Sequence, residues 1–284
     1  DDDDDDDDDE YPDPSARSSL LSSKQSIDCS YVVANRLHLA EHTVQGKRIF
    51  TAADVEFHLG KDGRLYALDL ARAFPPECAW VASHLPRNGR QSEFFRIMRP
   101  ELLAHIAKNG ITPPLSPDVF TGFSRGSPLE EALRLERGAE EATRYLVSVI
   151  IPGLAARIEE GTTVRLSEPV SSVLHREGIN CRHIGLLRAH LRRNLQARET
   201  LLVEIVTRTL KCLLRKRLRE GGSTSEFSLQ RRTVRFFNLV VNSERFWQTK
   251  VYEGIIRRFG KVALQEARAL TDSKTHGDEA GGGG

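Results

Sequence analysis

The sequence predicts an α+β protein in which a small β-hairpin-containing portion precedes a largely helical C-terminal half. Lys61-Asp62-Gly63-Arg64 places Asp-Gly at the centre of a tight turn, and residues 65–70 then alternate at the period of a strand. From Ile184 onward apolar residues recur at helical spacing instead, most regularly between Leu201 and Leu218. A strand signal followed by long helical signals is typical of the α+β class.

The β portion is expected before residue 77. Tyr31-Val32-Val33 combines aromatic and β-branched residues and predicts a first strand. Either Ile49-Phe50 or Val55–Leu59 supplies the first arm of the Asp-Gly hairpin. The second arm alternates, with Tyr66 and Leu68 on its apolar face.

Helical signals begin after the hairpin. Ser92 is expected to cap a helix from Glu93 to Asn109 that bends or breaks at Pro100 and stops at Gly110. The proline-rich residues 111–127 then predict a loop and an internal domain boundary.

Two further helical segments follow this loop. Ser127-Pro128, followed by two glutamates, predicts a helix start, and that helix should continue to about Glu160 with a bend or break near Pro152. Val251–Leu270 is the last segment with a helical pattern.

Charge is distributed very unevenly along the 284 residues. The formal net charge is +1, yet residues 1–10 are all acidic, and residues 182–261 hold 19 Lys and Arg against 6 Asp and Glu. An acidic run without apolar residues cannot offset the entropy of chain ordering. We therefore expect disordered tails at 1–30 and 271–284, with one domain spanning 31–270.

The four cysteines, Cys29, Cys78, Cys181 and Cys212, are scattered and form no CxxC pair. This spacing favours free thiols in a reducing, cytoplasmic setting. It also matches no zinc motif, so no metal or other cofactor is expected. No apolar run reaches the roughly 18 to 20 residues that cross a bilayer, so no membrane insertion is expected.

Several carboxylates surround the Asp-Gly hairpin and allow two interpretations. In kinase-like phosphotransferases a catalytic Asp precedes a hairpin whose second strand supplies a metal-binding Asp, and Asp54 and Asp69 are spaced comparably. However, His58 and Leu59 stand where such enzymes carry an Asn, so this interpretation includes a degenerate, non-catalytic relative of that architecture. The structural interpretation is that Asp69 and Arg72 form charge-assisted hydrogen bonds that lock the hairpin to the following loop.

Two motifs carry a resemblance to a known family. Asp54–Glu77 (DVEFHLGKDGRLYALDLARAFPPE) resembles the signature of the Clu domain, the central module of clustered-mitochondria proteins. Leu174–Leu187 (LHREGINCRHIGLL) resembles a second segment of that family, and the likeness extends over about residues 31–260. The resemblance implies a cytoplasmic, non-enzymatic binding or scaffold domain linked to mRNA, translation and mitochondrial distribution. It also implies a likeness to a large translation-initiation-factor subunit.

The motif positions are predicted to be structural or binding residues. They are Asp54, Glu56, His58, Asp62, Gly63, Arg64, Asp69, Arg72, Phe74, Pro75, Pro76, Glu77, Gly178, Ile179, Asn180, Arg182 and Gly185.

The basic C-terminal half supplies a separate set of candidates, because Lys and Arg contact phosphates. The candidate nucleic-acid contacts are Arg188, Arg192, Arg193, Arg208, Lys211, Arg215, Lys216, Arg217 and Arg219. The expected partners are mRNA or ribosome-associated proteins. The competing interpretations are an ordinary solvated helix face and a purely structural segment of a longer protein, and the sequence leaves the oligomeric state open.

Overall fold

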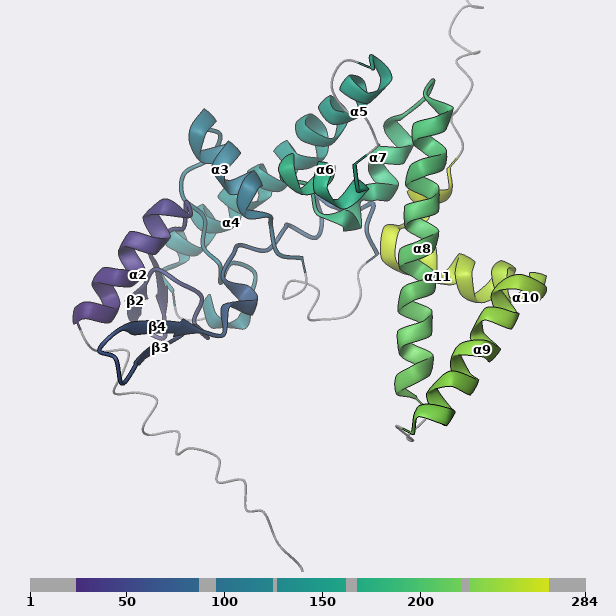
Figure 1. Ribbon diagram of the computed structural model, residues 1–284. Coiled ribbons are helices and arrows are strands. Elements are labelled where there is room, and N and C mark those ends of the chain that lie inside the picture. Colours follow the sequence, from purple (N-terminus) through teal and green to yellow (C-terminus); the bar gives the residue numbers. More distant parts are fainter. Residues whose placement is uncertain (1–23, 87–95, 125–126, 162–167, 221–224, 266–284) are drawn as a thin grey trace, which may run out of the picture. The chain divides into compact units, whose positions relative to one another are not determined.

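The computed structural model describes residues 24–86, 96–124, 127–161, 168–220 and 225–265 (Figure 1). The chain forms two compact units, Asp1–Ala82 with Asn88–Leu146, and Ser83–Arg87 with Val147–Gly284. Two β-hairpins lie in the first unit, and the described part of the second unit consists of helical segments and their connections. The predicted α+β class is therefore confirmed.

Most of both predicted tails lies outside the described residues, which begin at residue 24 and end at residue 265. Residues 24–30 are described, and they belong to helix α2 (Lys24–Arg36) rather than to a disordered tail. The loop 111–127, where an internal boundary was expected, lies within the first unit.

Helix α2 also replaces the strand predicted at residues 31–33. The β-branched residues favour a strand locally, but the buried side chains recur at the spacing of one helix face. Ser30 and Ala34, four residues apart, are both buried, whereas Tyr31, Val32 and Val33 are about half exposed. Packing of one helical face therefore overrides the local strand preference.

A first hairpin, absent from the predictions, joins β1 (His42–Val44) to β2 (Lys47–Ile49). Its turn residues Gln45 and Gly46 have φ values of 48° and 77°. Positive φ at both central positions is the requirement of a two-residue type I′ turn. Ile49 therefore belongs to this hairpin and not to the Asp-Gly hairpin.

The Asp-Gly hairpin pairs β3 (Glu56–Leu59) with β4 (Leu65–Leu68) in antiparallel register. The predicted two-residue turn is wrong in length. The Gly63 N–H donates to the Gly60 carbonyl at 2.9 Å, and Gly63 takes a φ of 75°. The loop therefore has three residues and ends in a left-handed glycine, a common hairpin connection.

The two faces of β4 differ from the prediction. Tyr66 and Leu68, expected on a packed apolar face, are 46% and 48% exposed. Leu65, on the opposite face, packs instead against a small buried cluster of Ala52, Val55 and Phe57. Alternation identified the two faces, but it did not identify which of them faces the core.

Helix α3 (Pro100–Asn109) begins later than predicted. Proline has no N–H and a fixed φ, which suits the first turn of a helix, so Pro100 starts the helix instead of bending it. Gly110 ends it in the left-handed conformation with a φ of 59°, as predicted. Ser92 and Glu93 lie outside the described residues.

The segment predicted as one helix up to Glu160 consists of α4 (Leu129–Tyr145), a π-helical turn (Leu146–Ile150) and α5 (Ile151–Glu159). Pro152 cannot donate to the carbonyl four residues earlier, which accounts for the interrupted hydrogen-bond ladder just before it.

The start of α4 is tied to strand β1. Glu131 accepts hydrogen bonds from the backbone N–H of Thr43 at 2.8 Å and from its hydroxyl at 3.1 Å. The Ser127 hydroxyl donates to the Thr43 carbonyl at 2.6 Å, and no side chain caps the N-terminus of α4.

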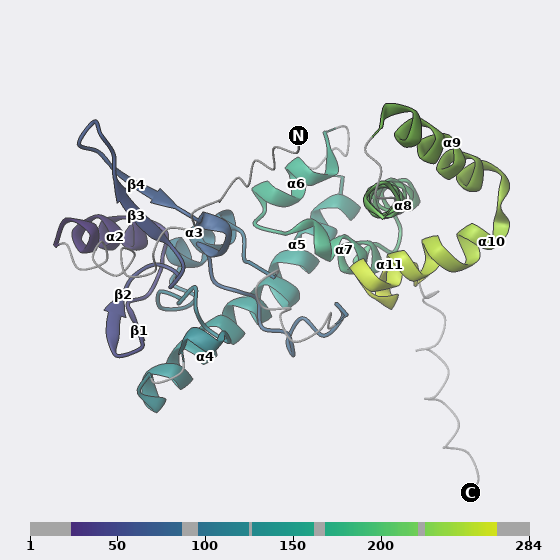
Figure 2. The same cartoon turned by 90° about the horizontal axis from the view of Figure 1, so that it is seen from below.

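The second unit continues along the chain with short and long helices. They are α6 (Val170–Arg176), α7 (Ile184–His190), α8 (Leu195–Arg219), α9 (Glu226–Asn242), α10 (Glu244–Phe246), a π-helical turn (Trp247–Val251), α11 (Tyr252–Phe259) and a 3-10 turn (Lys261–Leu264). The core forms where α7 packs against α5, α8 and the 3-10 turn, with Leu154, Ile184, Leu187 and Leu201 almost fully buried (Figure 2). Within the described residues, no helix is both long and apolar enough to cross a membrane.

Gly260 divides the predicted helix Val251–Leu270 into α11 and the 3-10 turn. It has a φ of 76°, and a Cβ at this position would lie 1.9 Å from the His84 carbonyl oxygen. Both constraints exclude a side chain here. Residues 266–270 of the predicted helix lie outside the described part.

Candidate nucleic-acid interface

Arg72 is the best-connected residue of the first motif. Its side chain is buried, with Nε 2.6 Å from Asp54 Oδ2 and Nη1 3.3 Å from Asp118 Oδ1. The prediction that Asp69 is the partner of Arg72 is wrong. Asp69 is exposed, has a φ of 56° and precedes the short 3-10 turn that carries Arg72. The lock at the hairpin exists, but Asp54 and Asp118 make it.

Asp118 is the centre of this network, and the sequence analysis missed it. It is fully buried, and its Oδ2 accepts from the Ala53 N–H at 2.8 Å and lies 2.9 Å from His42 Nε2. His42 Nδ1 lies 3.1 Å from the Ala40 carbonyl. Since a carbonyl cannot donate, a proton is held between His42 and Asp118.

The rest of the first motif forms internal contacts of the first unit. Asp62 receives a hydrogen bond from the Tyr66 hydroxyl at 2.8 Å, which together with the Arg64 N–H lowers the pKa of this carboxyl. Glu56 and His58 contact each other at 3.0 Å.

The proline segment of the first motif pairs with residues 96–98 instead of simply ending regular structure. The Pro75 carbonyl accepts from the Met98 N–H at 2.8 Å, and the Glu77 N–H donates to the Arg96 carbonyl at 2.7 Å. Pro75, Pro76 and Glu77 are buried, and Phe74 is half-buried.

The second motif forms a tight corner between α6 and α7. Gly178 has a φ of 73°, Ile179 is fully buried, and Asn180 Oδ1 accepts from the Arg182 N–H at 3.3 Å at the start of a 3-10 turn. A Cβ on Gly185 would lie 2.7 Å from Ala263 Cβ. This glycine therefore allows α7 to approach the C-terminal 3-10 turn closely.

His84 and His183 lie close together in the second unit, with His84 Nε2 2.9 Å from His183 Nδ1. Throughout the described residues, no group of three or more His, Cys, Asp or Glu side chains converges in a way that could hold a metal ion.

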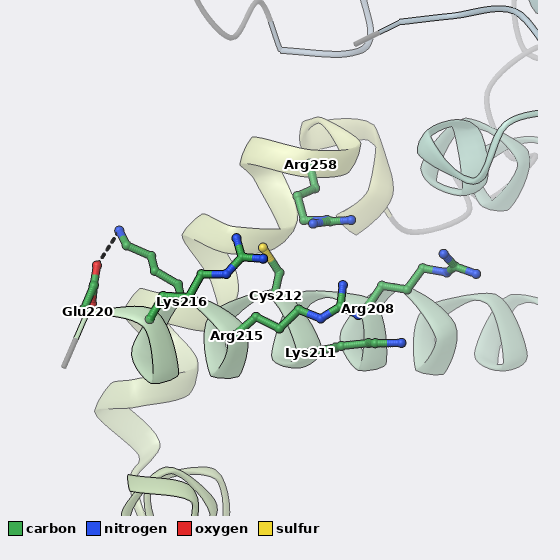
Figure 3. Close-up of a pocket in the computed structure, with 8 residues that line it drawn as sticks. Arg208, Lys211, Cys212, Arg215, Lys216, Glu220 and Arg258 are labelled. Atoms are coloured by element: carbon green, nitrogen blue, oxygen red, sulfur yellow. Dashed lines mark ion pairs between the residues drawn. The ribbon is translucent and has the colours of Figure 1, made fainter. Parts of the chain in front are cut away.

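A close crossing of α8 and α11 builds the basic surface of the second unit. A Cβ added to Gly254 on α11 would lie 2.7 Å from Thr209 Cγ2 on α8, and Thr209 is fully buried. One turn further along each helix, Arg258 and Cys212 project beside this crossing (Figure 3). Because Gly254 has no side chain, the two helices can approach closely at this point. This close approach determines the width of the space beside the crossing.

The resulting depression, which we call the basic groove, has a volume of about 520 Å³. It is lined by Arg208, Lys211, Cys212, Arg215, Lys216, Arg219, Glu220 and Arg258. Figure 3 shows Arg258 on α11, across from the row of side chains on α8. Sequence patterning found the α8 cations, but it could not find Arg258, because only the fold brings α11 beside them.

Few carboxylates neutralise the basic groove. Arg208 pairs with Glu204 at 2.6 Å, and Lys216 pairs with Glu220 at 3.5 Å. Among the described residues, Lys211, Arg215 and Arg219 have no carboxylate partner. The basic groove therefore concentrates positive charge in a concave, solvent-open site, which attracts anions.

The other predicted nucleic-acid contacts do not line the basic groove. Arg188 is buried and its Nη1 donates to the carbonyls of Ala263 and Gln265 at 2.9 and 3.0 Å, so it stabilises the fold and is not free to meet a phosphate. Arg192 and Arg193 are exposed in the turn before α8, where their backbone N–H groups donate to Glu159. Arg217 is exposed on α8 but does not line the basic groove.

Two family models match separate parts of the chain. The model described as Clustered mitochondria matches residues 15–80, which include the first motif. The model described as Translation initiation factor eIF3 subunit 135 matches residues 167–274, which include the second motif and the basic groove. No solved structure shows a significant match.

The curated relatives carry the same family name. The chain is 27% identical over 178 residues to the Clustered mitochondria protein homolog of Vanderwaltozyma polyspora, an alignment that covers 57% of this chain and 14% of the relative. It is 30% identical over 122 residues to the Clustered mitochondria protein of Arabidopsis thaliana, covering 39% and 8%. The homolog of Yarrowia lipolytica is 24% identical over 243 residues, covering 77% and 20%.

The chain thus spans a fifth or less of the length of these relatives. The Clustered mitochondria model over the first motif and the shared name of the relatives agree nonetheless: residues 15–80 are similar to the Clu domain of clustered mitochondria proteins.

Proposed function

We propose that this chain is a non-enzymatic, cytoplasmic binding module that holds RNA in the basic groove. The observation that carries the proposal is the set of three groove cations, Lys211, Arg215 and Arg219, that lack a carboxylate partner among the described residues. Phosphate oxygens supply the missing negative charge, and RNA presents them in a continuous row.

The names of the matching family models support a role in translation and mitochondrial distribution. The groove lies within the region similar to the initiation-factor subunit. Translation-associated proteins and mRNA are therefore the partners that we propose for this unit, with the first unit serving as its scaffold.

The kinase-like alternative receives no support from the first motif. Its proposed base, Asp54, is bound to Arg72 through Oδ2, and Asp69 is exposed beside a 3-10 turn. Oδ2 of Asp54 is therefore engaged by a guanidinium and is not available to accept a proton from a substrate hydroxyl.

The test is a titration of the full chain with a 20-nucleotide single-stranded RNA at low and at physiological salt. The affinity should fall steeply with salt, since each phosphate contact contributes a slope of about −0.7 in log K against log salt. Arg215→Gln should weaken binding, whereas Arg217→Gln, two residues away and outside the groove lining, should change it little. Absence of binding at low salt, or equal losses in the two variants, would contradict the proposal.

A chemical readout locates the bound RNA. Cys212 lines the groove and is partly exposed, so RNA should slow its alkylation. Cys78 serves as the internal control, because it is buried and burial raises the pKa of its thiol, which makes it slow to react with or without RNA. Unchanged alkylation of Cys212 at saturating RNA would place the binding site elsewhere.

A further inference from the structure

The lining of the basic groove consists of charged side chains and one cysteine. None of its eight residues is aromatic, and none is Asn or Gln. Proteins recognise unpaired bases by stacking them on aromatic rings or on Arg guanidinium planes and by hydrogen bonds to the base edges. In this lining the guanidinium groups are the planar groups that could stack, and they are the same groups that bind phosphates. Lys and Arg only donate, and the one carboxylate of the lining, Glu220, is paired with Lys216.

The cations of α8 are spaced as a track. Arg208, Lys211, Arg215 and Arg219 follow one another at intervals of three or four residues, so they project from the same side of the helix. At 1.5 Å per residue this row extends for about 16 Å, with roughly one cation per helical turn. Arg258 faces the row from α11 (Figure 3).

We infer that the basic groove takes the phosphodiester backbone of a single RNA strand, with its guanidinium groups on phosphates and not on bases. This inference rests on the proposed RNA binding and specifies which chemical part of the RNA is recognised. The row of cations on α8, with Arg258 of α11 facing it, holds a short run of consecutive phosphates, while the bases point away from the groove.

Glu220 gives the groove little capacity to accept hydrogen bonds. Its carboxylate is the one strong acceptor in the lining, and it faces Lys216 at 3.5 Å. No other carboxylate in the groove lining can accept a hydrogen bond from a base amino group. Affinity then depends on the number of phosphates and on salt, not on sequence.

The decisive experiment compares three strands of equal length on the full chain at one salt concentration. They are oligouridine, an abasic ribose-phosphate strand, and a uracil strand with an uncharged peptide backbone. The abasic strand should bind within about threefold of oligouridine, since base stacking, worth about fivefold or more per base where it occurs, contributes nothing when the guanidinium groups bind phosphates. The uncharged strand should not bind.

Each outcome separates the two proposals. If oligouridine binds and the abasic strand is tenfold weaker or worse, bases are recognised and this inference is wrong while the proposed RNA binding stands. If oligouridine itself does not bind, the proposed function fails.

A variant adds an independent readout. Replacing Arg215 and Arg219 together by Gln should lower the affinities for oligouridine and the abasic strand by the same factor. It should also reduce the magnitude of the salt slope by about 1.4, the value for two lost phosphate contacts on a single strand. The Arg217→Gln variant should leave both slopes unchanged. A factor that differs between the two strands, or an unchanged slope in the double variant, overturns the inference.

Discussion

Asp118 lies outside the family motif and connects three separate parts of the first unit. It connects Arg72, His42 and the backbone of Ala53 from a fully buried position. Two carboxylates, Asp54 and Asp118, face one guanidinium and one imidazole, so the network is balanced in charge when His42 is protonated. Buried charges are tolerated when they are paired and hydrogen-bonded in this way.

Replacement of Asp118 by Asn should therefore destabilise the protein strongly. The amide keeps the shape but leaves Arg72 with one carboxylate and removes the charge that faces His42. We expect a loss of about 3 kcal/mol in the free energy of unfolding, measured by urea denaturation. Asp69→Asn is the matched control, because this exposed residue should change stability by about 0.5 kcal/mol or less. Equal effects of the two substitutions would show that the network is not a lock.

The sequence predicted Arg72 as the lock residue but not its partners, for a physical reason. Asp69 is three residues from Arg72, and local spacing made it the obvious choice. Asp118 lies 46 residues further on, in a proline-rich loop. Asp is common in turns for local reasons, so its presence in such a loop does not indicate a buried partner for Arg72. Only tertiary folding shows that this carboxylate is buried.

Single elements were predictable where one local signal dominated. Helix α8 and the end of α3 at Gly110 follow directly from apolar periodicity and from a glycine cap. The segment at residues 31–33 was mispredicted because strand preference and helical packing disagree there. The basic groove could not be predicted in this way, because it forms between α8 and α11. Neither helix has a sequence feature that, by itself, indicates that the two cross.

Gly254 is the residue on which that crossing depends. In Gly254→Ala the new methyl would lie 2.7 Å from Thr209 Cγ2, so α11 must shift away from α8. Overpacking of this kind costs about 1–3 kcal/mol of stability, and the displaced Arg258 should also weaken RNA binding. Urea denaturation and the RNA titration measure the two effects.

Gly153→Ala is the control for this substitution. Gly153 lies in α5 with no atom within 4 Å of an added Cβ, and alanine is a better helix former. This variant should keep its RNA affinity and be as stable as the parent protein or more stable. If Gly254→Ala behaves like Gly153→Ala, the close approach of α8 and α11 does not shape the groove.

At the scale of the whole molecule, the two motifs label two units with different tasks. The first unit carries the first motif and the Arg72 network, and the second carries the corner motif and the basic groove. The net charge of +1 conceals this division, because an acidic N-terminal run offsets a strongly basic C-terminal half. Charge counted over the whole chain therefore says little about either unit.

The division predicts that stability and RNA binding can be lost separately. Asp118→Asn should lower the unfolding free energy of the first unit and leave the RNA dissociation constant within about twofold at a temperature where the protein is folded, since Asp118 belongs to the first unit and lines no part of the basic groove. Arg215→Gln should do the reverse, because an exposed side chain contributes little to stability. Urea denaturation and RNA titration on the same two variants provide the comparison. If Asp118→Asn abolishes RNA binding in the folded protein, or if Arg215→Gln destabilises it strongly, then the lock and the groove form one coupled structure and not two separate devices.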